Sequence, residues 1–248
     1  MRIIRIICLF LTLVVLAEAR PKRRSPERGG YVIGDKPPVL LLTFNDGNLL
    51  PATDWSPEGN NGTIVNNVTV ASDGPGGTCV NFTTGDDQIT CGTDSSLNCY
   101  QNITVSHWLK AGSFNQMTTL GRGGSNAKNH YWVYHEQSGS GWGMWVANVH
   151  TRPATPRIAV LDVWDHLVIT WRTSDNLMTF YFNGAYYDAQ TSAGNIANYA
   201  SSPLRIGVDP RDQVGLDWVG DMDEIVIYPY CMSADEIGEL YNRGKGEF

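Results

Sequence analysis

The chain has 248 residues, of which 42% are hydrophobic and 17% are charged. That hydrophobic fraction is enough to build a core, which excludes a wholly disordered chain. The formal net charge is −7, but residues 1–24 hold six of the 18 basic residues and only one of the 25 acidic residues. The remaining chain therefore has 12 basic and 24 acidic residues, a net charge of −12. This acidic charge after residue 24 argues against nucleic-acid binding, because phosphate contacts need clustered lysine and arginine.

Residues 1–19 have the pattern of a secretory signal peptide. Arg2 and Arg5 precede the apolar run Ile6–Leu16, and Ala17–Ala19 has the small-x-small pattern of a cleavage site. The apolar run is too short to cross a bilayer as a helix, so we expect no membrane insertion. The sequence therefore predicts a secreted, extracellular protein from which the first 19 residues are removed.

The cysteines and asparagines follow patterns that agree with secretion. Removal of Cys8 with the signal leaves four cysteines, which an oxidising compartment would pair. Four cysteines allow three pairings. We expect the disulfides Cys79–Cys231 and Cys91–Cys99, with Cys79–Cys91 as the main alternative. Four Asn-x-Thr sequons within 42 residues predict N-glycosylation at Asn61, Asn67, Asn81 and Asn102.

The rest of the chain divides into an arm, one domain and a tail. Residues 20–37 are basic and rich in proline and glycine, without hydrophobic periodicity, which predicts a flexible arm. The segment Arg20–Arg23 fits a processing site at basic residues, and an unprocessed tail is the alternative. We expect one folded domain over residues 38–243, and residues 244–248 form a short tail.

Short segments rich in Val, Ile, Thr and aromatic residues begin at residue 39 and alternate with turns, which predicts β-strands. Asn183-Gly184 is the strongest hairpin signal, because a tight primed turn needs φ > 0 at both positions. Regular strands with no helical pattern between them favour an antiparallel sandwich over a parallel sheet. We expect strands at 39–44, 78–82, 88–91, 103–110, 131–135, 142–149, 164–171, 178–182 and 224–228.

One helix is predicted, near the end of the domain. Ser233–Glu236 matches a capping box, in which the Ser233 hydroxyl and the Glu236 carboxylate each bond the other residue's backbone amide. Ile237, Leu240 and Tyr241 then fall on one helix face, and Gly244 is placed to end the helix. We expect this helix to cover one edge of the sandwich.

The motifs and their order resemble the laminin-G-like group of the concanavalin A-like jelly-roll superfamily, over residues 39–243. The segments Leu42–Gly47, Asp54–Ile64 and Ile103–Lys110 are similar to those of the family, and the closing Gly220–Tyr228 is the most specific match. The resemblance implies an all-β fold, an antiparallel jelly-roll β-sandwich with one short C-terminal helix. It does not imply one activity, because this fold carries lectins, matrix modules and glucanases.

Six acidic residues lie between Asp209 and Glu224, which raises the question of a calcium site. Calcium takes six to eight oxygen ligands, mostly carboxylates and backbone carbonyls. The resemblance implies an ion that ties the first strand to the last, and by position this nominates Asp46 and Asp223, with the carbonyls on either side of Asp46. The alternative is that Asp223 accepts hydrogen bonds from backbone amides and that the other acids face solvent.

Aromatic residues concentrate in a predicted hairpin over residues 130–145. Strand alternation turns about half of these rings outward in either register. Exposed rings beside His, Asn and Gln suit a sugar-binding face, because rings stack on apolar sugar faces while polar groups bond hydroxyls. Ordinary packing within the sandwich is the alternative. The candidate ligand-binding residues are Trp132, Tyr134, His135, Trp142 and Trp145.

The sequence contains no catalytic motif. A retaining glucanase needs two carboxylates about 5–5.5 Å apart, and the nearest candidate, Asp221–Glu224, has the wrong spacing. The histidines lack metal-ligand spacing, and no serine lies in a Gly-x-Ser-x-Gly turn. We therefore expect a non-catalytic module that binds carbohydrate or extracellular-matrix glycoproteins and that calcium stabilises. The alternative is a structural component of an extracellular organic matrix, such as that of a mineralised shell or skeleton.

Overall fold

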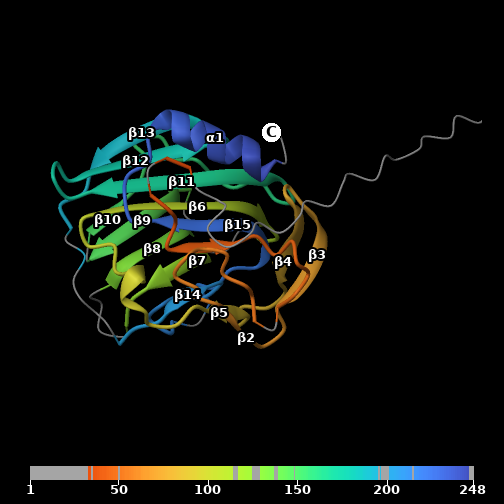
Figure 1. The fold of residues 1–248 in the computed structure, drawn as a ribbon. Coiled ribbons are helices and arrows are strands. Elements are labelled where there is room, and N and C mark those ends of the chain that lie inside the picture. The colour runs from red at the N-terminus through yellow and green to blue at the C-terminus, as the bar shows by residue number, and fades with distance from the viewer. Residues whose placement is uncertain are drawn as a thin grey trace, which may run out of the picture.

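The computed structural model describes residues 33–34, 36–49, 51–113, 117–124, 129–136, 139–147, 149–194, 196, 201–213 and 215–245. The predicted signal peptide and most of the predicted arm lie outside these residues. The described chain forms two stacked antiparallel β-sheets and one α-helix, which lies beside β13 (Ala185–Thr191) along the top of Figure 1. In this part of the chain, no helix is both long and apolar enough to cross a membrane.

The order of strands in both sheets is that of a β-sandwich with many crossovers. The eight-stranded sheet runs β13 (Ala185–Thr191), β12 (Leu177–Phe182), β11 (Trp164–Arg172), β6 (Asn102–Ala111), β15 (Gly220–Tyr228), β4 (Gly77–Phe82) and β3 (Thr69–Gly74), and β1 (Leu40–Leu42) pairs with β15. The seven-stranded sheet runs β10 (Val149–Thr151), β9 (Gly141–Ala147), β8 (Asn129–Glu136), β7 (Met117–Arg122), β14 (Leu204–Ile206), β5 (Gln88–Thr90) and β2 (Thr63–Val65). The predicted all-β antiparallel sandwich is confirmed.

The main core lies between the two sheets, because alternate side chains of each strand point inward. On β11, Leu167, Ile169 and Trp171 belong to this core, whereas Val168 points to the outer face of the eight-stranded sheet. The seven-stranded sheet contributes residues such as Val133. Burying one such large apolar side chain stabilises the fold by about 1.5–3 kcal/mol, so the core dominates stability.

A second apolar cluster explains where the C-terminal helix, α1 (Ala234–Gly244), packs. Ile237 and Leu240 are buried against Val168 and Val226, on the outer face of the eight-stranded sheet. The helix therefore covers a sheet face and not the edge that the sequence predicts. Its capping box is confirmed, because the Ser233 hydroxyl accepts from the amide of the third helical residue and that residue's carboxylate reaches back.

The same cluster includes Ile33, which is buried and whose carbonyl accepts a hydrogen bond from the Tyr230 hydroxyl. Ile33 therefore packs against the domain, although it precedes the predicted domain boundary at residue 38, and that boundary stays a prediction. The predicted hairpin is also confirmed: φ is 52° at Asn183 and 78° at Gly184. A Cβ on Gly184 would lie 2.9 Å from the Tyr241 ring, so this position needs glycine for its backbone and for the helix that packs on it.

All four cysteines of the described chain are free. Cys79 lies on β4, which pairs with the beginning of β15, whereas Cys231 lies beyond the end of β15. The Cys231 thiol donates to the carbonyl of Trp171, which is opposite Ile103 on β6, whereas Cys79 is at the level of Asp223, which is opposite Trp108. The two levels are five strand residues apart, roughly 16 Å, and a disulfide needs Cα atoms within about 7 Å. The Cys79–Cys231 pairing is therefore wrong. Cys91 and Cys99 lie in the main core near the same Tyr131 side chain, so their pairing stays a prediction.

Candidate functional site

The five candidate aromatic residues lie on β8 and β9, and they point to both faces of the seven-stranded sheet. Trp142 belongs to the main core, and the His135 ring contacts it with 4.9 Å between ring centroids. Trp132, Tyr134 and Trp145 alternate with core residues and point outward. The alternation that the sequence predicts is therefore present.

The outward rings form a closed group with His150 of β10. The group, called here the aromatic box, consists of Trp132, Tyr134, Trp145 and His150, whose neighbouring ring centroids are 4.9–6.1 Å apart. The box closes over Gly143, where a Cβ would lie 2.9 Å from the His150 Nε2 atom. These rings are therefore packed against one another and leave no gap for a ligand between them.

A loop covers the aromatic box from outside. The guanidinium of Arg211 lies 4.0 Å from the Trp132 ring centroid, and the buried carboxylate of Asp209 holds it at 2.6 Å. Trp132 and Tyr134 are only 3% exposed. The prediction of an exposed sugar-binding face is therefore wrong for Trp132, Tyr134, His135 and Trp142, all of which are buried, and for the half-exposed Trp145 it stays a prediction.

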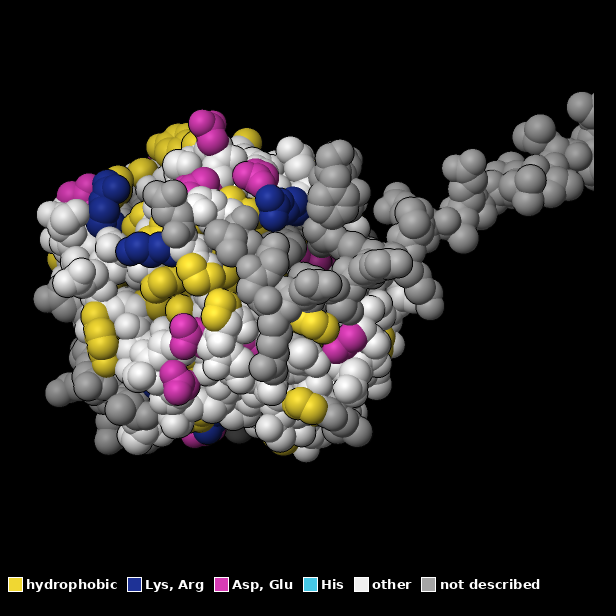
Figure 2. All heavy atoms as spheres, viewed as in Figure 1, with side chains coloured by type: hydrophobic (Ala, Val, Ile, Leu, Met, Phe, Trp, Pro, Cys, Tyr) yellow, Lys and Arg dark blue, Asp and Glu magenta, His cyan; other side chains and the backbone are white. Residues whose placement is uncertain are grey.

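A groove with a volume of about 710 Å³ lies instead on the outer face of the eight-stranded sheet, beside the start of α1. In Figure 2, hydrophobic side chains gather below α1, with basic and acidic side chains around them. Strands β11, β12 and β13 provide the floor of the groove, and the segment that leads into α1 provides a wall. The groove is lined by Lys36, Thr170, Arg172, Leu177, Thr179, Tyr181, Tyr186, Ala189, Tyr230, Cys231, Met232, Ser233 and Glu236.

The floor of the groove combines a flat ring with hydroxyl groups. Tyr186 is 62% exposed, and its ring meets the Tyr181 ring edge to face at 6.0 Å. Thr170 and Thr179 are cross-strand partners on the same floor. Arg172 is held in place by two hydrogen bonds to the carboxylate of Asp175, of 2.6 and 2.9 Å. An aromatic platform beside fixed donors and acceptors can stack on a sugar ring and bond its hydroxyls.

The wall of the groove is fixed by a buried hydroxyl. Thr104 Oγ1 donates to the Tyr230 carbonyl at 2.6 Å and accepts from the Met232 amide at 3.0 Å. Burial raises the pKa of the Cys231 thiol to about 11, so the thiol is protonated at neutral pH and is a poor nucleophile. Among the described lining residues, Glu236 is the one carboxylate, and it caps α1. The groove therefore has polar binding groups but no carboxylate pair.

Sequence reasoning missed the groove because its residues come from several separate segments. The Asn183-Gly184 turn predicts the hairpin, but no local sequence pattern relates the outward residues of that hairpin to the helix that follows later. The signal was present: Thr179, Tyr181 and Tyr186 alternate outward on one hairpin, and the amphipathic helix needs a sheet face to pack on. These residues come together with those of β11 on one floor only when β11 and β12 pair.

Asp223, one of the two predicted calcium ligands, is buried and accepts hydrogen bonds from the amides of Gly76 (3.2 Å) and Glu224 (2.8 Å). These are the backbone contacts that the alternative interpretation predicts. The Glu224 carboxylate in turn accepts from the Asn45 amide group at 3.4 Å, which ties the first strand to the last.

Asp46, the other predicted ligand, is exposed and accepts from the Asn48 amide (3.1 Å) and the Thr53 hydroxyl (2.8 Å). The hydrogen bonds described above for Asp46 and Asp223 thus go to different partners. Other acids between residues 209 and 224 are paired with cations: Asp209 with Arg211 and Asp212 with Arg205. Calcium binding by Asp46 and Asp223 stays a prediction.

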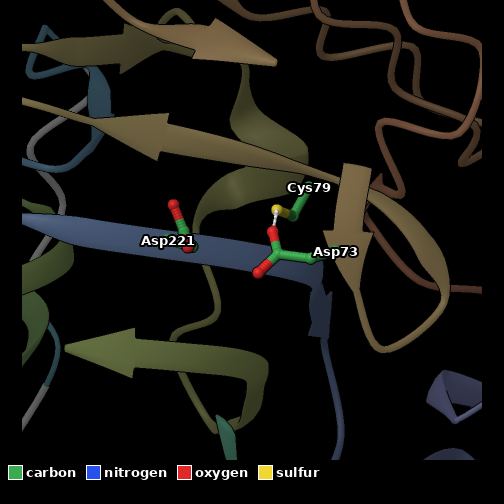
Figure 3. Close-up of side chains that lie close together, drawn as sticks. All are labelled: Asp73, Cys79 and Asp221. Atoms are coloured by element: carbon green, nitrogen blue, oxygen red, sulfur yellow. Dashed lines mark hydrogen bonds between the residues drawn. The ribbon is translucent and has the colours of Figure 1, made fainter. Parts of the chain in front are cut away.

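A further acidic group brings Asp73 of β3, Cys79 of β4 and Asp221 of β15 together, with their ligand atoms within 4.8 Å of one another (Figure 3). The Lys110 ammonium lies between the two carboxylates, 2.5 Å from Asp73 and 2.7 Å from Asp221. Burial, followed by the nearby Asp221 charge, raises the pKa of the Cys79 thiol well above its usual range. The group is therefore an ion-pair network in which lysine supplies the cation.

The predicted glycosylation sites differ in their surroundings. Asn61 and Asn67 are exposed, whereas Asn81 and Asn102 are half-buried. The Asn81 amide nitrogen donates to the Asp221 carboxylate and so belongs to the ion-pair network. The fold thus leaves Asn67, in the turn between β2 and β3, among the most accessible of the four.

Comparison with solved structures finds the same fold in sugar-related and toxin domains. Domain 4 of AbnA, a GH43 extracellular arabinanase from Geobacillus stearothermophilus solved with arabinotriose, is 18% identical with a TM-score of 0.63, covering 84% of this chain and 100% of that domain. The binding domain of Paraclostridial Mosquitocidal Protein 1 is 15% identical with a TM-score of 0.62, covering 84% and 52%. The binding domain of Botulinum Neurotoxin DC, solved in complex with SialylT, is 14% identical with a TM-score of 0.58, covering 86% and 52%.

The chain thus spans about half the length of the two toxin domains, and at these identities the likeness shows a shared fold. Comparison with curated proteins gives no match. The family model described as "Concanavalin A-like lectin/glucanases superfamily" matches residues 83–238, which is more than half of the chain. With the sandwich topology and the capped C-terminal helix, this match identifies the chain as a member of the concanavalin A-like lectin/glucanases superfamily.

Proposed function

We propose that the protein is a secreted, non-catalytic carbohydrate-binding module and that the groove beside α1 holds the sugar. The observation that carries this proposal is the Tyr186 ring, 62% exposed on a paired strand and directed into a groove that also contains the Thr170 and Thr179 hydroxyls. A flat exposed ring on a rigid strand needs little reordering to stack on a sugar face. Neutral hydroxyls and the Arg172 guanidinium supply directional hydrogen bonds.

The arrangement of charges supports binding without catalysis. Glycoside hydrolysis normally requires a pair of carboxyl groups that flank the scissile bond. Glu236 is the one carboxylate among the described lining residues, and it already accepts the Ser233 amide at 2.6 Å. The fold also occurs in domains solved with bound oligosaccharide, such as the arabinanase domain solved with arabinotriose. Extracellular glycans or matrix glycoproteins are the partners that we infer, and Asp46 and Asp223 remain the proposed calcium ligands.

The proposal is tested by a glycan array with the purified protein after enzymatic removal of its own N-glycans. We expect saturable binding to a defined sugar class. Tyr186→Ala should weaken the affinity at least about tenfold, or 1.4 kcal/mol, because the stacking surface is lost. Tyr186→Phe keeps the ring and should retain most of the affinity.

Trp145→Ala is the matched control, because it removes the half-exposed ring of the aromatic box on the opposite sheet. Loss of binding in Trp145→Ala but not in Tyr186→Ala would move the site to the aromatic box. The array is read once with calcium and once with a chelator. If the protein binds no glycan under either condition, that result would support the structural-matrix alternative.

A further inference from the structure

Asn102 is the first residue of β6 and begins the sequon Asn102–Thr104. Ile103 and Val105 point into the main core. Because side chains alternate along a strand, Asn102 and Thr104 point to the outer face of the eight-stranded sheet. This is the face that carries α1 and the groove.

The strand register places Asn102 at the mouth of the groove. Asn102 is directly opposite Arg172 on β11, and Thr104 is opposite Thr170. Arg172 and Thr170 both line the groove. Directly opposed residues of an antiparallel pair have Cβ atoms about 4.5–5.5 Å apart. A sugar attached to the half-buried Asn102 side chain therefore starts beside the floor of the groove.

Thr104, the threonine of the sequon, also supports the wall of the groove. Its hydroxyl holds the backbone of Tyr230 and Met232, which form the groove wall. A substitution at Thr104 would therefore disturb the wall as well as the sequon. A substitution at Asn102 instead removes the glycosylation site and leaves the Thr104 hydrogen bonds to the groove wall in place.

We propose that Asn102 carries an N-linked glycan whose first sugars lie in the groove. The step takes place in the secretory pathway, where Asn102 Nδ2 attacks C1 of the first sugar of a lipid-linked diphosphate oligosaccharide. The N–C1 bond forms, the bond from C1 to the diphosphate oxygen breaks, the amide nitrogen releases one proton, and the lipid diphosphate leaves. The assignment of sugar to the groove rests on the proposed function.

Tethering gives this glycan an advantage over free sugars. A group held by a short flexible linker has an effective concentration in the millimolar range. An external sugar whose Kd is weaker than that range is therefore kept out of the groove. The Asn67 glycan has no such access, because β2 and β3 lie at the edges of the two sheets opposite to β10 and β13.

The test uses the full chain made in a glycosylating secretory host, with Asn102→Gln and the matched control Asn67→Gln. Mass spectrometry first establishes whether each asparagine is occupied. Glycan release by a peptide-N-glycosidase is then followed at both sites. We expect release from Asn102 to be at least tenfold slower than from Asn67 in the folded protein, and equal after denaturation.

The half-exposed Cys231 provides a second readout within the groove. We expect its alkylation by a maleimide to be at least threefold faster in Asn102→Gln than in the wild type and unchanged in Asn67→Gln. An unoccupied Asn102, equal release rates at the two sites, or an unchanged Cys231 rate would overturn the inference. Slow release from Asn102 together with no array binding by Asn102→Gln would support the inference and overturn the proposed function.

Discussion

The guanidinium of Arg211 lies over the Trp132 ring and is bound by the carboxylate of Asp209, whose side chain is fully buried. Arg211→Ala removes the cation–π contact and leaves a buried carboxylate without its cation. We expect the free energy of unfolding to fall by about 2–3 kcal/mol, measured by urea denaturation. The pair Arg205–Asp212 has an Asp212 side chain that is 69% exposed, so Arg205→Ala is the control and should cost less than about 1 kcal/mol. Equal effects of the two substitutions would contradict this account.

The aromatic box also shows how far sequence reasoning reaches at single residues. The alternation of Trp132 and Tyr134 with core residues follows from strand geometry and was predicted. Their burial was not, because the covering residue Arg211 lies some 80 positions later in the sequence. Whether an outward ring is exposed depends on loops from elsewhere in the fold, and hydrophobic periodicity contains no information on those loops. Lys110 was likewise missed as the cation between Asp73 and Asp221.

At the scale of elements, the first turn of α1 also stabilises a wall of the groove. Ser233→Ala removes the hydroxyl that accepts from the Glu236 amide, and we expect a loss of about 1 kcal/mol of unfolding free energy. Ser233→Thr keeps a capping hydroxyl and should restore most of that stability. Thermal and urea denaturation of both variants measure the effect. If Ser233→Thr is as unstable as Ser233→Ala, capping is not the cause.

Elements with local signals were predicted well, whereas elements defined by long-range pairing were not. The capping box and the Asn183-Gly184 turn are complete within a few residues, and both are confirmed. The three-residue strands β2 and β14 are too short to show periodicity, and β3 has only Thr69 and Val70 as strand-forming residues before a polar end. The predicted strand 142–149 is divided in the structure into β9 and β10. The position of α1 on a sheet face depends on outward apolar residues of four separate strands and so could not be predicted from the helix alone.

For the whole molecule, stability depends on pH through buried histidines. Burial lowers the pKa of His107 and of His166 to about 3. Unfolded histidine has a pKa near 6.5, so below that pH the unfolded state binds protons that the folded state does not. The stability that the two neutral histidines contribute is therefore fully present above pH 6.5. It is lost as the pH falls from 6.5 toward 3, by up to about 1.4 kcal/mol per pH unit for each histidine. Urea denaturation at pH 7.5 and 5.0 should show a lower midpoint at pH 5.0, and His107→Gln should reduce the difference.

The position of β15 has a consequence for biosynthesis. This strand lies between β6 and β4 in the middle of the eight-stranded sheet, yet among the described strands it is the last to be made. A nascent chain that lacks it would have two half-sheets with unpaired edges, and β1 would lack the strand with which it pairs. Strand pairing between distant segments is slow. The eight-stranded sheet of this domain should therefore close only after β15 has left the ribosome, and until then chaperones would encounter an open sheet with a gap at its centre.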